Sequence, residues 1–425
     1  MRFLLLTLGT RGDVQPYLSL GLGLQRAGQD VTVCASSSFA PWIRGHGLGY
    51  AHLNNDIIDL VNSQAGQRAF ERRGGLLGLP RRMVEASRNF KRIFRRTLAE
   101  QWEAAQGTDA LVYHPNAVGG SHIVEAMGIP GIMADPLPTW VPTGSSAHIV
   151  APEFPLGAWY NRLTHRMIGA VPGLLFGSVV SRWRREVLGL RRQPVFPDEL
   201  VRSDGRPVPV ILGFSRHVFP PPPDWPATVR VTGYWFLDEG RSWQPPSSLC
   251  EFLAAGPAPV FVGFGSMPGR DPARTGRIVL EALARSGQRG LIVTGWGGMT
   301  VPDPPPGVYI ADFVPYDWLL PQVAAVVHHG GAGTTAAGLR AGKPTVVCPF
   351  VADQPFWGRR VRALGAGPAP IAQRKLSVET LAEAVRVAAS DPEMRRKAAE
   401  LGDKIRAEDG VGDAVGYILK CVGEQ

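Results

Sequence analysis

The residues with the clearest chemical potential form the segment HHGGAGTT at residues 328–335. An apolar run enters this segment and a helix-like pattern leaves it, so we expect a strand that turns directly into a helix. Glycines let a backbone approach a ligand closely, and a helix N-terminus offers N–H groups and a partial positive charge. His329, Thr334 and Thr335 add side-chain donors. The segment therefore predicts a phosphate cradle.

Two other interpretations of this segment stay open. A tight strand–helix turn would use the same glycines without any ligand, and the segment matches neither a GK[ST] phosphate loop nor a GxGxxG fingerprint. The adjacent His328 and His329 could suggest a metal site. No acidic or cysteine residue is spaced to join them, so we expect no metal.

Four further loops follow predicted strands in the same half of the chain, at residues 263–266, 294–298, 312–315 and 351–356. Ligands of open α/β sheets bind outside the carboxyl ends of the strands, so these loops are candidate ligand contacts.

Particular side chains in these loops suit a sugar or a base. The acid–amide pair Asp353 and Gln354 suits vicinal hydroxyls, because both side chains can form bidentate hydrogen bonds. Trp296 and Phe313 could flank a base or sugar, although an aromatic residue more commonly fills a core.

The first half offers one carboxylate in a comparable place. Residues 10–16, TRGDVQP, follow the first apolar run. We expect them to form a loop in which Gly12 permits a sharp turn and Pro16 opens the following helix. Asp13 is either the cap of that helix or a general base. Arg11 either pairs with Asp13 or approaches phosphates.

These residues need two sheets to position them. Strands alternate with helices from Phe3–Leu8 through a helix at Pro16–Ala27 and strands at Asp30–Ala35, Ala110–Tyr113, Gly131–Ala134 and Val208–Gly213. Proline-rich residues 219–226 and 244–246 then interrupt the pattern, and we interpret this region as a linker.

The alternation restarts after the linker. The expected strands are Pro259–Gly263, Leu291–Gly295, Val308–Ala311, Ala324–His328 and Thr345–Pro349, and the expected helices are Pro272–Ser286, Thr334–Ala341, one from about Gln354, Val378–Ala389 and Glu393–Ala407. A chain of 425 residues is too long for one ordinary domain, so we predict an α/β fold with two doubly wound parallel-sheet domains. The predicted domains are residues 1–225 and 226–425, with residues 226–258 as the linker.

Four motifs of the chain resemble those of a known family. The motifs GTRGDVQP, GFGSM, HHGGAGTT and PFVADQPFW, in this order, are similar to those of GT-B glycosyltransferases of family 1. The branch that looks nearest is that of the sterol glucosyltransferase-like and glycopeptide-antibiotic enzymes. The resemblance covers nearly the whole chain and is weakest from about residue 60 to residue 200, where acceptor specificity resides in this family.

The resemblance implies roles for matching positions. It implies two Rossmann-like domains facing across a cleft, with the last helix, about residues 408–425, packing back on the first domain. Asp13 would be the base, and Thr10, Arg11 and Gly12 would be phosphate or interface contacts. The implied donor-binding residues are Gly265, Ser266, Trp296, Phe313, Val314, His329, Gly331, Gly333, Thr334, Asp353 and Gln354.

The implied reaction is metal-independent transfer of a hexose with inversion at the anomeric carbon. The donor would be UDP-glucose or a dTDP-sugar, and the acceptor a hydroxyl of a sterol, polyketide or other lipophilic natural product. A nucleotide-sugar epimerase on the same fold and a non-catalytic nucleotide-sugar-binding protein are the alternatives. An oxidoreductase is disfavoured because the turn at Gly9–Gly12 lacks the GxGxxG spacing.

The formal net charge of +9 has a local origin. Residues 68–96 contain ten basic residues against Glu71 and Glu85, with apolar residues between them. Such a stretch could rest on an anionic membrane surface, and a solvated, mobile acceptor loop is the alternative. We expect no nucleic-acid partner, because no recognised binding module is present.

The sequence also bears on location. Residues 3–8 are too short an apolar run for a signal-peptide core, and the uncharged stretch Met167–Ser181 is shorter than a membrane span needs. Four scattered cysteines suggest neither a disulfide framework nor a zinc site. We therefore expect a cytoplasmic protein with peripheral membrane contact as an option.

Overall fold

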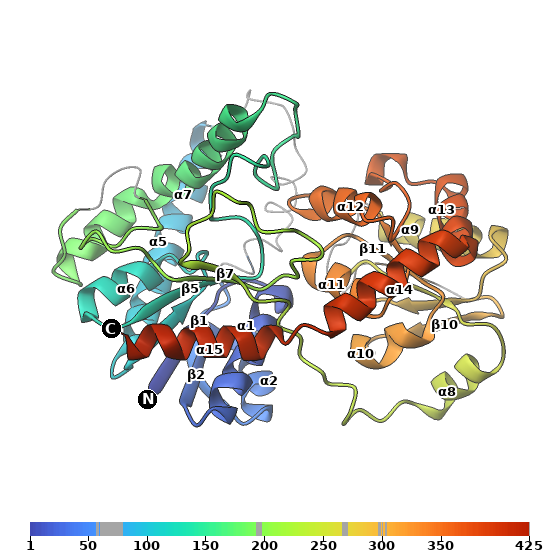
Figure 1. The fold of residues 1–425 in the computed structure, drawn as a ribbon, viewed down its shortest axis with the longest axis horizontal. Coiled ribbons are helices and arrows are strands. Elements are labelled where there is room, and N and C mark those ends of the chain that lie inside the picture. The colour runs from blue at the N-terminus through green and yellow to red at the C-terminus, as the bar shows by residue number, and fades with distance from the viewer. Residues whose placement is uncertain are drawn as a thin grey trace. The chain divides into compact units, whose positions relative to one another are not determined.

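The computed structural model describes residues 1–56, 59, 80–192, 198–265, 271–295, 299, 301 and 304–424, with residues 80–89 as backbone only. The chain forms two compact units (Figure 1). Unit 1 comprises Met1–Phe214, Pro221–Leu237 and Asp409–Gln425, and unit 2 comprises Ser215–Pro220 and Asp238–Glu408.

Unit 1 is built on a seven-stranded sheet with the order β3-β2-β1-β4-β5-β6-β7, in which every neighbouring pair is parallel. Its strands are β1 (Arg2–Leu6), β2 (Asp30–Ser36), β3 (Gly49–Leu53), β4 (Ala110–Tyr113), β5 (Gly131–Asp135), β6 (Val210–Leu212) and β7 (Val229–Val231). Its helices are α1 (Arg11–Arg26), α2 (Ala40–Gly45), α5 (Pro80–Ala105), α6 (Gly119–Met127), α7 (Ala158–Glu186) and α15 (Gly410–Gly423).

Unit 2 is built on a five-stranded parallel sheet with the order β10-β9-β8-β11-β12. Its strands are β8 (Val260–Gly263), β9 (Gly290–Val293), β10 (Val308–Ala311), β11 (Ala325–His328) and β12 (Thr345–Val347). Its helices are α8 (Ser247–Ala254), α9 (Pro272–Arg285), α10 (Tyr316–Leu319), α11 (Ala332–Arg340), α12 (Gln354–Ala363), α13 (Val378–Ser390) and α14 (Pro392–Arg406). The prediction of two doubly wound parallel sheets is confirmed.

The burial of the central strands shows why this sequence forms a parallel sheet covered by helices. Residues 3–6 of β1 and all of β4 are buried, as expected for parallel strands covered by helices on both faces. In the register, Leu6 lies between Cys34 and Tyr113, so β1, β2 and β4 end at the same edge of the sheet. The loops that follow these strands therefore share that edge.

The last helix, α15, belongs to unit 1. It lies along α1 (Figure 1), and Val411 and Val415 occupy the space that a Cβ on Gly23 of α1 would need. Ala414 and Ile418 are fully buried in the core of this unit. Burial of these apolar side chains fixes α15 to unit 1.

Two expectations about local structure need correction. The helix predicted from Pro16 begins at Arg11, because the carbonyl of Thr10 accepts the N–H groups of Asp13 and Val14. Pro16 therefore lies inside α1 rather than at its start. Within the expected linker of residues 226–258, β7 pairs with β6 and so forms part of the first sheet.

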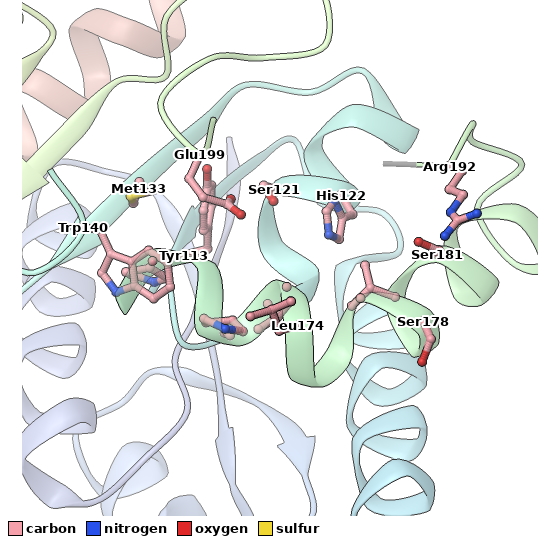
Figure 2. Close-up of a pocket in the computed structure, with 18 residues that line it drawn as sticks. Tyr113, Ser121, His122, Met133, Trp140, Leu174, Ser178, Ser181, Arg192 and Glu199 are labelled. Carbon is pink, nitrogen blue, oxygen red and sulfur yellow. The ribbon is translucent and has the colours of Figure 1, made fainter. Parts of the chain in front are cut away.

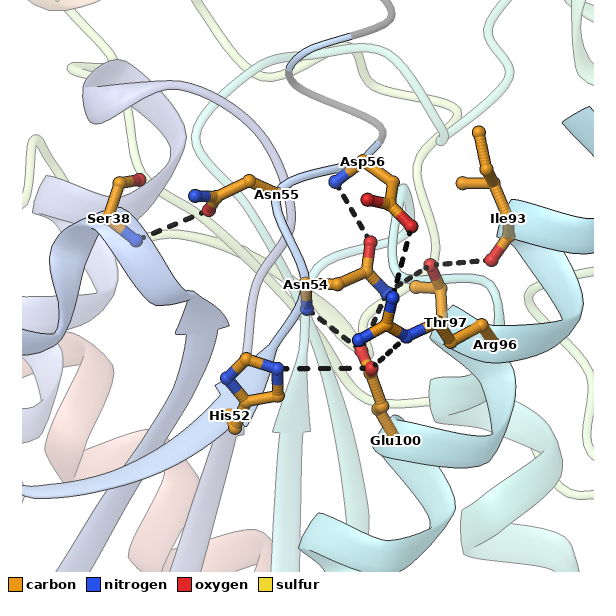
Figure 3. Close-up of polar contacts among 9 residues, drawn as sticks. All are labelled: Ser38, His52, Asn54, Asn55, Asp56, Ile93, Arg96, Thr97 and Glu100. Atoms are coloured by element: carbon orange, nitrogen blue, oxygen red, sulfur yellow. Dashed lines mark hydrogen bonds and ion pairs between the residues drawn. The ribbon is translucent and has the colours of Figure 1, made fainter.

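The basic segment of residues 68–96 also differs from a loop where it is described. Residues 80–96 belong to α5, and residues 68–79 lie outside the described residues. Glu100 ties α5 to the end of β3 (Figure 3): its Oε2 accepts the backbone N–H and side-chain amide of Asn54 at 2.8 and 2.7 Å, and its Oε1 accepts Nε of Arg96 at 2.9 Å. Arg96 also pairs with Asp56 at 3.5 Å. The network holds α5 against the sheet.

Candidate functional site

In unit 2 the candidate site lies where the strand order reverses, between β8 and β11. Loops that leave neighbouring strands on either side of such a point diverge and leave room for a ligand. A Cβ built on Gly265, after β8, would lie 3.1 Å from Cε1 of His329, after β11. A Cβ on Gly295, after β9, would lie 3.2 Å from the carbonyl oxygen of Gly265. The structure therefore brings three of the predicted loops together.

The turn from β11 into α11 requires its glycines. Gly330 has φ +95°, and a Cβ there would lie 2.7 Å from Cγ1 of Val347. Gly331 is the N-cap of α11, and a Cβ there would lie 2.6 Å from Nε2 of His329. Only glycine fits both positions without displacing a neighbour.

The start of α11 is open to an anion. No acidic residue lies in its first turn, and no side chain caps it. Gly333 is exposed, and no atom lies within 4 Å of a Cβ built there. Thr334 follows in the same turn, half-buried. Thr335 does not fit the role of ligand donor, because it is buried and its hydroxyl donates to the carbonyl of Gly331 at 2.9 Å.

The two histidines differ in role. His328 is fully buried, and its Nδ1 accepts the N–H of Gly330 at 2.9 Å, so it stabilises the turn. Burial lowers the pKa of His329 to about 4, which keeps its ring neutral near pH 7. Nδ1 of His329 is buried without a hydrogen-bond partner among the described residues. A neutral ring can still donate one hydrogen bond to an anion.

Asp353 and Gln354 sit at the start of α12, after β12. Oδ2 of Asp353 accepts Nε1 of Trp357 at 2.8 Å, and burial raises the pKa of this carboxyl. Oε1 of Gln354 accepts the backbone N–H groups of Phe350 and Val351 at 2.7 and 3.1 Å. These bonds fix the side chains, and the second carboxylate oxygen and the amide nitrogen form no hydrogen bond to the described residues.

The residue before Asp353 also marks this loop. Ala352 is the one non-glycine residue with positive φ in the described part of the chain, at +57°. Residues held in this conformation carry strain and cluster at ligand-binding sites.

The remaining predicted donor-binding residues differ in their exposure, and two of them are not described by the structure. Phe313 is 49% exposed after β10, whereas the side chain of Val314 is 2% exposed and packs in the core with Phe261. Val314 could therefore meet a ligand only through its backbone. Ser266 and Trp296 lie outside the described residues.

In unit 1, Asp13 lies in the first turn of α1, at the carboxyl edge of the sheet. Its Oδ2 accepts the backbone N–H of Thr10 at 2.7 Å and the Thr10 hydroxyl at 3.1 Å. The sharp turn is at Gly9, with φ +146°, where a Cβ would lie 2.2 Å from Oδ2 of Asp13. Gly12, which was expected to make that turn, has room for a Cβ inside the helix. The carboxylate is thus positioned and half-buried.

Arg11, beside Asp13, is exposed and lies against an aromatic ring. Its guanidinium carbon is 4.6 Å from the ring centroid of Trp42, and its Nε donates to Gln15 at 3.4 Å. The stacking holds the positive charge at the same edge of the sheet as Asp13.

Sequence reasoning missed a buried polar cluster at this edge. Asp135, at the end of β5, is 1% exposed, and its carboxylate accepts the Leu137 N–H at 2.9 Å and the Thr139 hydroxyl. Nε2 of His114, after β4, lies 3.9 Å from Oδ1 of Asp135. Tyr17 of α1 donates to the carbonyl of Ala134. A polar residue at the end of each of two adjacent strands was the available signal.

The pKa values in this cluster are shifted by burial. Burial raises the pKa of Asp135 to about 7, and the charge of Asp13 adds to the effect. Burial lowers the pKa of His114 to about 3, so its ring is neutral. Nδ1 of His114 accepts the Asn116 N–H at 3.0 Å, which places the ring proton on Nε2, toward Asp135.

Unit 1 also contains a cavity of about 250 Å³ between the sheet, α6 and α7 (Figure 2). Its walls are largely apolar, and Trp140, Met133 and Leu174 contribute to them. Polar side chains also line it: Tyr113, Ser121, His122, Ser178, Ser181, Arg192 and Glu199. Burial raises the pKa of Glu199 to about 7, and Nδ1 of His122 faces the guanidinium of Arg184 at 2.9 Å, which leaves Nε2 as the donor.

Among the described residues, no group of three or more His, Cys, Asp or Glu side chains could hold a metal ion. The four cysteines are free thiols.

The two ends of the chain match different protein families. Residues 3–143 match the glycosyltransferase family 28 N-terminal domain. Residues 292–416 match the C-terminal domain of erythromycin biosynthesis protein CIII-like proteins.

Among curated relatives, the sterol 3-beta-glucosyltransferase of Emericella nidulans is 37% identical over 98% of this chain and 29% of its own length. That of Eremothecium gossypii is 38% identical over 98% of this chain and 34% of its own length. The chain thus spans about a third of the relatives it matches.

Solved structures share the fold. The kitacinnamycin glycotransferase has a TM-score of 0.70 at 19% identity, covering 99% of this chain and 98% of its own. The calicheamicin glycosyltransferase CalG4 has a TM-score of 0.70 at 18% identity, covering 100% and 98%. The Streptomyces sp. SF2575 glycosyltransferase SsfS6 complexed with thymidine diphosphate has a TM-score of 0.61 at 22% identity, covering 99% of each chain. The chain thus has the GT-B fold, and it matches the family 28 N-terminal domain over residues 3–143 and the EryCIII-like C-terminal domain over residues 292–416.

Proposed function

We propose that this chain transfers glucose from a nucleotide diphosphate sugar to a hydroxyl of a sterol-like lipophilic acceptor, with inversion at the anomeric carbon. The observation that carries the proposal is the acid-free, glycine-lined start of α11 at the strand-order reversal of unit 2. Relatives named sterol 3-beta-glucosyltransferases support glucose and a sterol as the substrates.

The donor diphosphate is proposed to bind at the N-terminus of α11. Backbone N–H groups at Gly333 and Thr334 would donate to phosphate oxygens, and the helix dipole would favour their negative charge. The neutral ring of His329 would add one donor. Asp353 and Gln354 would hold hydroxyls of the sugar, through the oxygen and nitrogen that the loop leaves unused. UDP is the proposed carrier, with dTDP as the tested alternative.

The reaction needs a base and a stabilised leaving group. In the proposed step the acceptor oxygen forms a bond to the anomeric carbon while the bond from that carbon to the diphosphate oxygen breaks. The acceptor proton passes to Asp13, and the diphosphate leaves with an additional negative charge. The start of α11 would stabilise that charge as it develops, which lowers the barrier rather than merely tightening donor binding. This arrangement assigns no role to a metal.

The acceptor is proposed to use the cavity of unit 1. Largely apolar walls suit a polycyclic hydrocarbon, and Glu199 and His122 offer an acceptor and a donor for a polar substituent. The cavity lies beside β4, the strand that neighbours β1, which precedes Asp13. An apolar body with few polar groups is therefore the favoured chemistry.

The decisive experiment is product analysis. Purified protein is incubated with UDP-glucose or dTDP-glucose, with and without a panel of sterols, and products are identified by mass spectrometry and the anomeric configuration by NMR. We expect a β-glucoside from an α-linked donor, formed only with a sterol present. A changed sugar nucleotide without acceptor would indicate an epimerase, and donor binding without any product would indicate a binding protein.

A further inference from the structure

An exposed apolar surface of unit 1 lies on one face of α7. Six side chains form it, and we call them the α7 stripe: Trp159, Leu163, Met167, Val171, Leu174 and Leu175. Their spacing of three or four residues places them on one side of the helix. Their exposed fractions run from 42% to 66%. Exposed apolar patches of this kind mark interaction sites.

The other face of α7 is firmly packed. Val179, Val180 and Trp183 are buried, and the ring of Phe176 stacks on Phe90 and Phe94 of α5 with centroids 5.0 and 4.6 Å apart. In the described part of the chain, α7 is the one helix whose length and composition would allow it to cross a membrane. These contacts attach α7 to unit 1, and the stripe lies on the exposed side of the helix.

The charges around the stripe are positive. Four exposed arginines lie on the same helix, two near its start and two in its last turns: Arg162, Arg166, Arg182 and Arg185. Arg162 pairs with Asp224 at 3.2 Å and Arg182 with Glu186 at 3.4 Å, so Arg166 and Arg185 are the main candidates for lipid phosphates. Glu186 is the single acidic residue of α7. Long arginine side chains can extend past an apolar surface to reach phosphate groups. This pattern of apolar and basic side chains fits a partner that has an apolar interior and an anionic surface.

The stripe is also continuous with the cavity of unit 1. Leu174 belongs to both: it is 66% exposed, and it lines the cavity (Figure 2). Gly173 and Gly177 line the cavity as well. A lipophilic molecule in contact with the stripe would therefore lie at the cavity wall.

We propose that the α7 stripe docks on the surface of an anionic lipid bilayer, with the stripe in the acyl–headgroup boundary and the arginines on lipid phosphates. Basic residues around an apolar helical face are the feature that distinguishes this occupant from a second copy of the chain, which would bring like charges together. Docking does not depend on the proposed sugar transfer, and its test uses no sugar.

The test is co-sedimentation of the full chain with vesicles of phosphatidylcholine alone or of phosphatidylcholine and phosphatidylglycerol in equal amounts. We expect stronger binding to the anionic vesicles, lost at high salt. The triple variant Trp159→Ser, Met167→Ser and Leu175→Ser should bind at least about tenfold more weakly, because three apolar side chains no longer enter the lipid. Val201→Ser, an exposed apolar residue outside the stripe, is the control and should bind as wild type.

A second pair of variants tests the charges without touching the apolar face. Arg166→Glu with Arg185→Glu should weaken binding to anionic vesicles by roughly 25-fold or more, at about fivefold per arginine lost from the surface. Arg274→Glu with Arg277→Glu, exposed on α9 of unit 2, makes the same change in net charge and should leave binding unchanged. Thermal melting of each variant checks that it folds.

Three results would overturn the proposal. Wild-type protein that does not sediment with anionic vesicles is one. Stripe and charge variants that both bind as wild type are another. The third is a wild-type dimer, seen by light scattering, that the stripe variant dissociates while vesicles are not bound, since the stripe would then face a second copy.

Discussion

Helices α1 in unit 1 and α11 in unit 2 both begin directly after a strand at the carboxyl edge of a sheet, yet their first turns have opposite chemistry. α1 carries Asp13, whose carboxylate accepts the N–H of Thr10. α11 follows Gly331, with no acidic residue in its first turn and no capping side chain. The same local fold thus offers a fixed negative charge in one unit and an acid-free, uncapped helix start in the other.

The largest expected effect, on kcat, comes from removing the negative charge of Asp13 while preserving the start of helix α1. In Asp13→Asn the amide oxygen can still accept the Thr10 N–H, so the helix start is preserved. An amide cannot take a proton, so we expect kcat to fall between about 10²- and 10⁴-fold. Steady-state kinetics measures kcat. Calorimetric titration measures donor affinity, which should stay unchanged.

The matched control is Asp391→Asn, the same substitution at the N-cap of α14, where Asp391 accepts the N–H groups of Glu393 and Met394. This variant should lose a similar small amount of stability and none of the activity. Turnover near wild type in Asp13→Asn would leave Asp13 with the capping role alone.

The next effect concerns the donor side. His329→Ala removes a donor expected to contact the diphosphate, and a hydrogen bond to a charged group contributes about 1.5–3 kcal/mol. The donor Kd should therefore rise by roughly ten- to 100-fold. Since the pKa of His329 is lowered to about 4, donor binding by wild type should not change between pH 6 and 8 through this residue. Calorimetric titration at three pH values checks both points.

A smaller effect, on nucleotide binding, is expected from placing a carboxylate in the first turn of α11, as Asp13 does in α1. Gly333→Asp places a carboxylate at the open start of α11, where a Cβ meets no neighbour. The helix dipole should make this variant slightly more stable, while repulsion should weaken nucleotide binding by at least roughly tenfold. Gly333→Asn is the neutral control of equal size, and it should retain most of the affinity. Equal affinity in both variants would argue against an anion at this helix start.

The smallest effect tests the buried carboxylate beneath α1. Because burial raises the pKa of Asp135 to about 7, the folded protein binds this proton more tightly than the unfolded chain does. Wild type should therefore lose stability as the pH rises from 5 to 8. Asp135→Asn should lose less over the same range. Urea unfolding at pH 5, 6.5 and 8 measures the slope, and identical slopes would show that Asp135 is ionised throughout.

The parts of the fold and site that depend on local patterns could be predicted. The apolar runs of the parallel strands, the turn at Gly330 and Gly331 and the loop with Asp353 and Gln354 each occupy a short stretch of sequence. The terminal helix α15 was implied by the family resemblance rather than by any local pattern.

Two predictions from local sequence preferences were wrong because other contacts in the structure outweigh those preferences. Pro16 suggested a helix start, but the bonds between Thr10 and Asp13 begin α1 five residues earlier. Val314 follows a strand, as ligand contacts do, but its side chain completes the core with Phe261.

Other features could not be found from one stretch of sequence at all. His114 and Asp135 meet only because β4 and β5 are neighbours, and the spacing of 21 residues along the chain carries no sign of it. The uncharged stretch Met167–Ser181 looked too short for a membrane, whereas α7 extends well beyond it at its N-terminal end. Which face of that helix stays exposed is decided by its contacts with α5.

The membership of α15 in unit 1 has a consequence for how the protein is made. Unit 1 begins at the first residue of this chain, but its core includes Ala414 and Ile418, which emerge from the ribosome only after all of unit 2. The five-stranded unit can therefore fold during synthesis, whereas the seven-stranded one must wait for its last helix. A premature stop codon shortly before Gly410 would leave unit 2 intact and expose the face of α1 that α15 covers, so the damage would appear at the opposite end of the sequence from the mutation.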